Sequence, residues 1–147
     1  MKGFHGSVES IVLFGSTARG ESEPRSDIDL FVLTSGYERD RFEREREAYW
    51  ALGLVRAKYR KDTTVFNLNI GEAEDISPML MNIAYDGVIL YDASGEGERL
   101  LASIREAVDR AGLVRYKIKD VYGWKTKRPL KWGEVISVEL KKPEHPR

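Results

Sequence analysis

The chain has 147 residues, and its 24 Lys and Arg balance 24 Asp and Glu, so the formal net charge at pH 7 is zero. This length is enough for one domain with a hydrophobic core, and a neutral chain would bind nucleic acid only through a local basic patch. The absence of cysteine excludes disulfides, thiolate metal sites and a cysteine nucleophile. No apolar run approaches the ~18 residues of a membrane span, and no signal peptide is visible, so we expect a soluble, cytoplasmic protein.

Apolar runs rich in β-forming residues predict the strands of the fold. The first run ends at a Gly-Ser pair, and the polar segment 20–26 predicts a loop before the second run. The expected strands cover residues 11–14, 28–33, 63–70, 88–91, 115–119 and 135–140.

Helical spacing and capping signals predict three helices. The first, over 37–55, is dense in charged residues. The second, over 78–86, follows a serine N-cap and begins with a first-turn proline. Apolar residues at helical spacing between 100 and 111 predict the third. The apolar stripe expected on the first helix consists of Phe42, Tyr49 and Leu52.

The segment 15–19, directly after the first strand, has the features of a phosphate-binding turn. A glycine without Cβ lets the backbone turn sharply and approach a ligand closely, and the amides that follow can point at phosphate oxygens. Ser16 adds a hydroxyl donor, and Arg19 can reach phosphate with its planar guanidinium. Taken alone, this segment is also compatible with a plain turn and a solvated arginine.

Asp27 and Asp29 stand at the start of the second strand, and residues i and i+2 of a strand point to the same face. Two carboxylates about 5 Å apart repel each other by ~3 kcal/mol at an effective dielectric constant of about 20. A bound cation would offset this repulsion, and oxygen ligands beside phosphate favour Mg²⁺ or Mn²⁺. An isolated Asp-x-Asp pair would instead indicate two solvated acids, or Asp27 as a turn cap.

The two segments together are more specific than either alone. A Gly-Ser pair followed after ten residues by Asp-x-Asp should arise by chance in roughly one chain in several hundred. With these residues, the stretch 11–33 resembles the nucleotidyltransferase superfamily of the DNA polymerase β type. It is most similar to the small, stand-alone minimal nucleotidyltransferases of prokaryotes.

This resemblance implies transfer of a nucleoside monophosphate to a hydroxyl with release of pyrophosphate, and ATP is the expected donor of AMP. It assigns Asp27 and Asp29 to two Mg²⁺ (or Mn²⁺) ions, as catalytic and metal-binding residues. The nucleotide-binding residues that we expect are Gly15, Ser16, Arg19 and Ser26.

The fold that the resemblance implies is α/β, with a mixed sheet and helices packed largely on one side. We expect a single domain over 1–147, with a nucleotidyltransferase core over 8–92 and a C-terminal extension of helix and strands over 93–147. Family members usually carry a helix before the Gly-Ser strand, for which the segment 1–9 is too short. We therefore expect either a truncated sequence or a partner that covers this face.

The family also uses a third carboxylate on a neighbouring strand, which ligates metal and helps to deprotonate the attacking hydroxyl. The matching strand over 63–70 contains no acid, and Asn67 and Asn69 share the face where the carboxylate is expected. General-base assistance is typically worth ~10²–10⁴-fold. Either Asp62 or Glu72 reaches into the site, or the protein binds nucleotide and metal with poor turnover.

The segment 115–132 is basic and contains several aromatic residues. Such a segment can bind single-stranded nucleic acid or an acidic partner. The simpler interpretation is a strand with Tyr116 and Ile118 inward and with Arg115, Lys117 and Lys119 in water.

Two functions of different classes therefore compete most closely. One is a metal-dependent nucleotidyltransferase that uses ATP or another nucleoside triphosphate. The other is a catalytically weak or inactive nucleotide-binding antitoxin or regulatory subunit, paired with a helical HEPN-type protein as in many small family members. Nucleic-acid binding and a homodimer are left open, and no membrane partner is expected.

Overall fold

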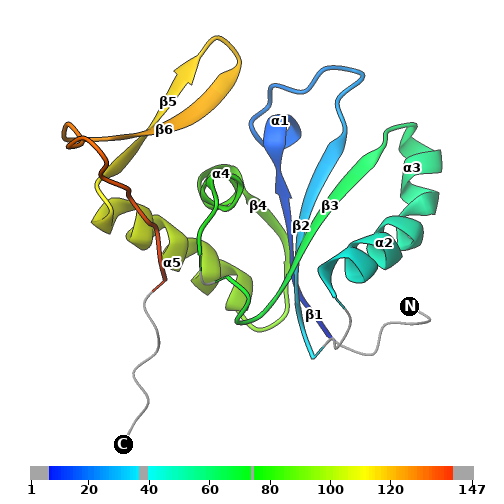
Figure 1. The fold of residues 1–147 in the computed structure, drawn as a ribbon. Helices are drawn as coiled ribbons and strands as arrows, with labels where there is room; N and C mark the ends of the chain where they lie inside the picture. Colours follow the sequence, from blue (N-terminus) through cyan, green and yellow to red (C-terminus); the bar gives the residue numbers. More distant parts are fainter. Residues whose placement is uncertain (1–6, 37–39, 74, 141–147) are drawn as a thin grey trace, which may run out of the picture.

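The computed structural model describes residues 7–36, 40–73 and 75–140 of the chain. Its strands are β1 (Ser7–Phe14), β2 (Ile28–Ser35), β3 (Thr63–Asn69), β4 (Val88–Asp92), β5 (Leu113–Ile118) and β6 (Val121–Thr126). The first four form a sheet of order β3-β2-β1-β4, and β5 and β6 form a separate hairpin (Figure 1). β1 is antiparallel to β2 and β4, whereas β2 and β3 are parallel, so the sheet is mixed, as predicted.

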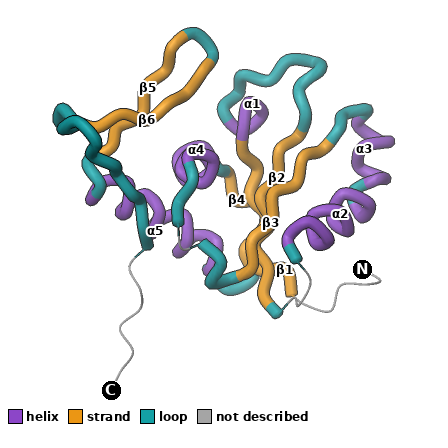
Figure 2. The backbone as a smooth tube through the Cα atoms, in the orientation of Figure 1, coloured by secondary structure: helices purple, strands orange, loops and turns teal. Residues whose placement is uncertain are grey.

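Helices connect these strands and complete an α/β fold (Figure 2). They are α1 (Gly15–Ala18), α2 (Arg41–Ala51), α3 (Gly53–Tyr59), α4 (Pro78–Asp86) and α5 (Glu96–Arg110). α4 has the bounds that its capping signals predicted, and the Ser77 hydroxyl accepts a hydrogen bond from the Leu80 amide at 3.2 Å. No helix in the described part of the chain is long and apolar enough to cross a bilayer.

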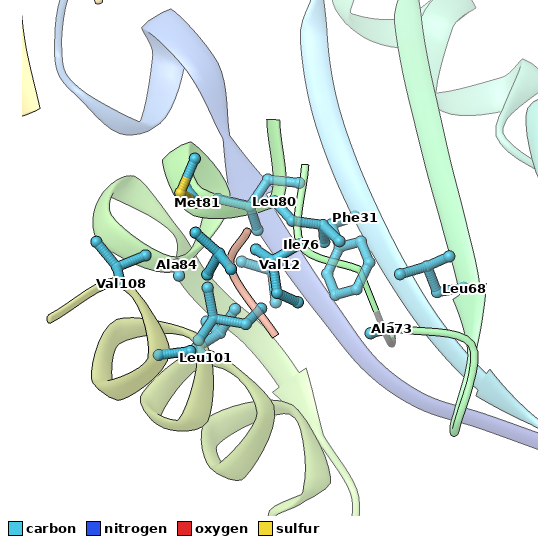
Figure 3. Packing of buried hydrophobic residues seen from close by; sticks show 14 of the residues in the cluster. Val12, Phe31, Leu68, Ala73, Ile76, Leu80, Met81, Ala84, Leu101 and Val108 are labelled. Carbon is cyan, nitrogen blue, oxygen red and sulfur yellow. The ribbon is translucent and has the colours of Figure 1, made fainter. Parts of the chain in front are cut away.

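The hydrophobic core lies between one face of the sheet and helices α4 and α5 (Figure 3). Val12 of β1, Phe31 of β2 and Leu68 of β3 belong to this core, each from one strand of the sheet. Leu80 of α4 and Leu101 of α5 belong to the same buried cluster. Helices α2 and α3 lie beside β3, away from α4 and α5 (Figure 1).

α2 contacts the sheet through polar side chains rather than through the apolar stripe that the sequence predicted. Phe42 of that stripe is 77% exposed, whereas Arg44 is 3% exposed. The Arg44 guanidinium donates to Asn67 Oδ1 and lies 2.7 Å from Glu72 Oε1. A buried cation is costly unless acceptors surround it, and these polar partners are what allow α2 to pack on β3.

Three further elements differ from the sequence prediction. The charged helix expected over 37–55 is interrupted at Leu52, which separates α2 from α3, and residues 37–39 lie outside the described part. The strand expected over 135–140 does not form within the described residues, where Glu139 contributes only an isolated bridge. The strand β6 was not anticipated, and it pairs with β5 as the second strand of a hairpin.

Candidate active site

The end of β1 and the start of β2 bring the two predicted segments together. Asp29 pairs with Phe14, the last residue of β1, and so lies beside the Gly-Ser turn that begins α1. Gly15 has φ +74°, and a Cβ at this position would lie 2.2 Å from Asp29 Oδ2. Glycine both adopts this left-handed backbone without strain and leaves room for the carboxylate. The expected phosphate turn and the expected metal ligands therefore meet at one end of these strands.

The Asp29 carboxyl is half-buried, and this burial raises its pKa above the ordinary value. The negative charge of Asp27 raises the same pKa, whereas a hydrogen bond from Thr64 and the positive charge of Arg19 lower it. The charge of Asp27 thus acts on Asp29, as the spacing of the two residues predicted.

Asp27 and Asp29 form a donor set that fits Mg²⁺, which is commonly bound by one or two carboxylates together with substrate phosphates. Across the residues that the structure describes, no group of three or more His, Asp or Glu side chains is arranged to hold a metal ion. These two acids would therefore act with oxygens of the nucleotide and of water, rather than as a closed protein cage.

The parallel pairing of β2 with β3 places Thr64 beside Asp29. Thr64 donates a hydrogen bond to the Asp29 carboxylate. Asn67 instead pairs with Val32, on the opposite face, and its amide donates to the Val32 carbonyl at 2.7 Å. The expectation that Asn67 and Asn69 occupy the position of the third carboxylate is therefore wrong, and a threonine stands there.

Neither of the two flanking acids replaces the missing carboxylate. Asp62 Oδ1 accepts from the Tyr49 hydroxyl at 3.2 Å and lies 3.9 Å from Arg56 Nε, so it faces the α2–α3 side. Glu72 follows β3 at the end of the strand away from Asp29. Thr64, which lies beside Asp29, and Asn69, the last residue of β3, are roughly 17 Å apart along the strand.

The other expected nucleotide ligands lie in and after α1. The Ser16 carbonyl accepts from the Glu21 amide at 2.9 Å. Arg19 Nη1 lies 3.1 Å from Asp86 Oδ2, and Arg19 Nε lies 3.1 Å from Glu21 Oε2. The Ser26 hydroxyl accepts from a loop amide at 2.8 Å and so stabilises the turn before β2. Arg19 is thus anchored by acids that the sequence did not single out.

Comparison with known proteins settles the family of this chain. The family model for the polymerase beta nucleotidyltransferases matches residues 4–96, which is more than half of the chain. The chain belongs to the polymerase β-type nucleotidyltransferase family. A search of the curated proteins gave no significant match.

Several solved structures are similar to this chain at low sequence identity. One is a toxin–antitoxin complex with AMP-PNP, at 20% identity over 70% of this chain and 76% of that chain, with a TM-score of 0.49. A mutant of the toxin–antitoxin pair MntA-HpeT has 18% identity, the same coverage and a TM-score of 0.49. The tri-AMPylated HEPN toxin of Shewanella oneidensis with its MNT antitoxin has 19% identity, coverage of 70% and 75%, and a TM-score of 0.42.

The β5–β6 hairpin lies outside the residues that the family model matches, yet it adjoins the candidate site. Arg115 donates to Asp86 through both terminal nitrogens, each at 2.6 Å. The Tyr122 ring contacts two guanidinium groups, with its centroid 4.6 Å from Arg19 Cζ and 4.0 Å from Arg115 Cζ. The hairpin is therefore joined to α1 and α4 through charged and aromatic contacts.

The orientation of this hairpin is the reverse of the simpler interpretation of the sequence. Arg115 and Lys117 face the rest of the protein, and Lys117 Nζ lies 3.0 Å from Glu21 Oε1. Ile118, expected inward, is 64% exposed. Alternation along the strand defines its two faces, but it does not indicate which face turns inward, so sequence reasoning missed these residues. Nucleic-acid binding by the segment 115–132 stays a prediction.

Proposed function

We propose that the chain is a metal-dependent nucleotidyltransferase that moves a nucleoside monophosphate, AMP from ATP, to a hydroxyl acceptor. The observation that carries this proposal is the contact between Gly15 and Asp29, which joins a phosphate-type turn to an Asp-x-Asp pair. The raised pKa of the Asp29 carboxyl, caused by burial and by Asp27, supports it, because a bound cation would relieve both effects.

In this reaction the acceptor oxygen forms a bond to the α-phosphorus, and the bond from that phosphorus to the bridging oxygen of the β-phosphate breaks. Pyrophosphate leaves, and the proton of the acceptor hydroxyl passes to water. Asp27 and Asp29 would hold Mg²⁺, whose charge would stabilise the phosphate oxygens during transfer. Ser16 and Arg19 would hold the phosphates of the leaving group in place.

The test is transfer of labelled AMP in the presence and absence of Mg²⁺. Asp29→Asn should abolish Mg²⁺-dependent transfer, because the amide is a weaker ligand and carries no charge. Asp109→Asn is the matched control, since the Asp109 side chain is 79% exposed and contacts Lys127 in the extension. The proposal would be refuted if the Asp29→Asn variant still transferred AMP. It would also be refuted if Asp109→Asn abolished transfer as completely as Asp29→Asn.

Thr64 favours a second candidate, a nucleotide-binding antitoxin or regulatory subunit with little or no turnover. A threonine beside Asp29 can donate a hydrogen bond but does not act as a carboxylate ligand or a general base. In this case calorimetry would detect Mg-ATP binding while wild-type transfer stays near background. Thr64→Asp should then raise transfer by about 10²-fold or more, whereas the matched Thr64→Asn should not.

Pairing with a HEPN-type protein belongs to this second candidate. Co-expression with a HEPN-type protein, followed by size-exclusion chromatography with light scattering, distinguishes a heteromeric complex from a homodimer. Elution of the chain free of such a partner would remove this part of the proposal.

A further inference from the structure

The carboxylate of Glu21 is surrounded by three hydrogen-bond donors from two separate parts of the chain. Glu21 Oε2 accepts from Arg19 Nε at 3.1 Å, and Oε1 accepts from Lys117 Nζ at 3.0 Å and from the Tyr122 hydroxyl at 2.8 Å. These donors, Tyr122 foremost, lower the pKa of Glu21 to about 2. A guanidinium, an ammonium and a phenol that converge on one anion constitute an anion-binding arrangement.

Other contacts hold these donors in place independently of Glu21. Asp86, whose side chain is 9% exposed, accepts from Arg19 at 3.1 Å and twice from Arg115 at 2.6 Å. The Tyr122 ring lies 4.0 Å from Arg115 Cζ, within the range of a cation–π contact. Arg19 and Tyr122 would therefore keep their positions if Glu21 moved away, and Lys117 Nζ would keep its contact with the Tyr122 ring, 5.1 Å from the centroid.

The Glu21 carboxylate has the features of a group that a bound anion can displace from these donors. Glu21 lies in the loop between α1 and β2, and its side chain is 40% exposed. Its amide donates to the Ser16 carbonyl at 2.9 Å, so the donor cluster adjoins the Gly-Ser turn. The cluster contains three cationic side chains and two carboxylates, and it therefore stays positive even with Glu21 in place.

A terminal phosphate satisfies these donors better than a carboxylate does. It carries about −1.5 to −2 charges at pH 7 and three acceptor oxygens, against one charge and two oxygens for Glu21. We propose that Arg19, Lys117 and Tyr122 bind the terminal phosphate of the nucleoside triphosphate, and that Glu21 occupies this site until the nucleotide displaces it. This inference rests on the proposed function for the identity of the ligand.

Two consequences follow from this assignment. Lys117 and Tyr122 are nucleotide-binding residues contributed by the hairpin, outside the segment that the family model matches. Glu21 competes with the nucleotide for the same donors. The chain would therefore bind ATP more weakly than it would without the Glu21 carboxylate.

Isothermal titration calorimetry of the full chain with Mg-ATP, AMP and inorganic pyrophosphate tests the proposal. Lys117→Gln and Tyr122→Phe should each weaken Mg-ATP binding, the former by about tenfold, through loss of a hydrogen bond to the terminal phosphate. Neither should alter AMP binding. Glu21→Gln should tighten Mg-ATP and pyrophosphate binding by about threefold or more, because the competing charge is removed.

Lys125→Gln is the matched control, because Lys125 lies on the opposite face of the same hairpin and pairs with Val114. It removes one positive charge and should leave Mg-ATP binding unchanged. An equal effect of Lys125→Gln and Lys117→Gln, unchanged binding in Lys117→Gln, or weaker binding in Glu21→Gln would overturn the proposal. Melting temperatures close to that of the wild type establish that the variants are folded.

AMP transfer measured on the same samples separates this proposal from the proposed function. Transfer by the wild type, with no effect of Lys117→Gln on Mg-ATP binding, would refute the phosphate site alone. Mg-ATP binding that depends on Lys117 without any transfer would refute the enzyme alone. If the wild type bound neither Mg-ATP nor pyrophosphate, both the phosphate site and the proposed enzyme would be refuted.

Discussion

Replacement of Gly15 by alanine should force apart the two halves of the site. Gly15 has φ +74°, a conformation in which an alanine costs about 1–2 kcal/mol. The new Cβ would also lie 2.2 Å from Asp29 Oδ2, and overpacking typically costs about 1–3 kcal/mol. Together these effects predict a loss of about 2–5 kcal/mol, or roughly 6–15 °C in Tm for a domain of this size.

Gly20→Ala separates the two contributions. Gly20 has φ +72°, nearly the same backbone as Gly15, but a Cβ there would meet nothing within 4 Å. Its substitution should therefore cost only the backbone term of about 1–2 kcal/mol, or roughly 3–6 °C. Thermal denaturation followed by circular dichroism measures both variants under the same conditions.

The contact with Asp29 is tested by a double-mutant cycle. In an Asp29→Ala background the nearest atom left to a Cβ at position 15 is the Cβ of residue 29, at 3.4 Å, which is ordinary contact. Gly15→Ala should then cost no more than Gly20→Ala. If Gly15→Ala is no more destabilising than Gly20→Ala in the wild-type background, the reasoning about this contact is wrong.

Three further predictions concern stability. Asn67→Ala should lower the free energy of unfolding by about 2–3 kcal/mol in urea titrations, because Arg44 loses a buried acceptor; a loss under 0.5 kcal/mol would contradict this. Ser77→Ala should cost about 1 kcal/mol through loss of the α4 cap, whereas Ser77→Asp should retain most of the stability. The folded-state pKa values of Glu21 and Glu134 are about 2, below their ordinary 4.5, so their contribution is present above pH 4.5 and is lost as the pH falls toward 2. Between pH 5 and pH 3 the Tm of the double variant Glu21→Gln/Glu134→Gln should therefore fall less than the Tm of the wild type. An equal fall in Tm for the two proteins would refute this linkage.

The sequence alone was sufficient for the features that depend on neighbouring residues. A serine N-cap followed by proline determines where α4 begins, because capping is a matter of a few consecutive residues. The spacing of Asp27 and Asp29 likewise predicted that the charge of one acts on the other, since only one residue separates them at the start of β2. The Gly-Ser turn and this acid pair were enough to indicate the family that the family model later matched.

Only the tertiary structure determined which residues meet across elements. The position beside Asp29 belongs to Thr64 rather than Asn67, because the register between β2 and β3 is set by strands that lie some 35 residues apart in sequence. In the same way, β5 has two well-defined faces in the sequence, but contacts with α4 and with the loop after α1 decide that Arg115 and Lys117 turn inward. Local patterns specify periodicity and caps, whereas register and the choice of the buried face depend on surfaces that distant segments supply.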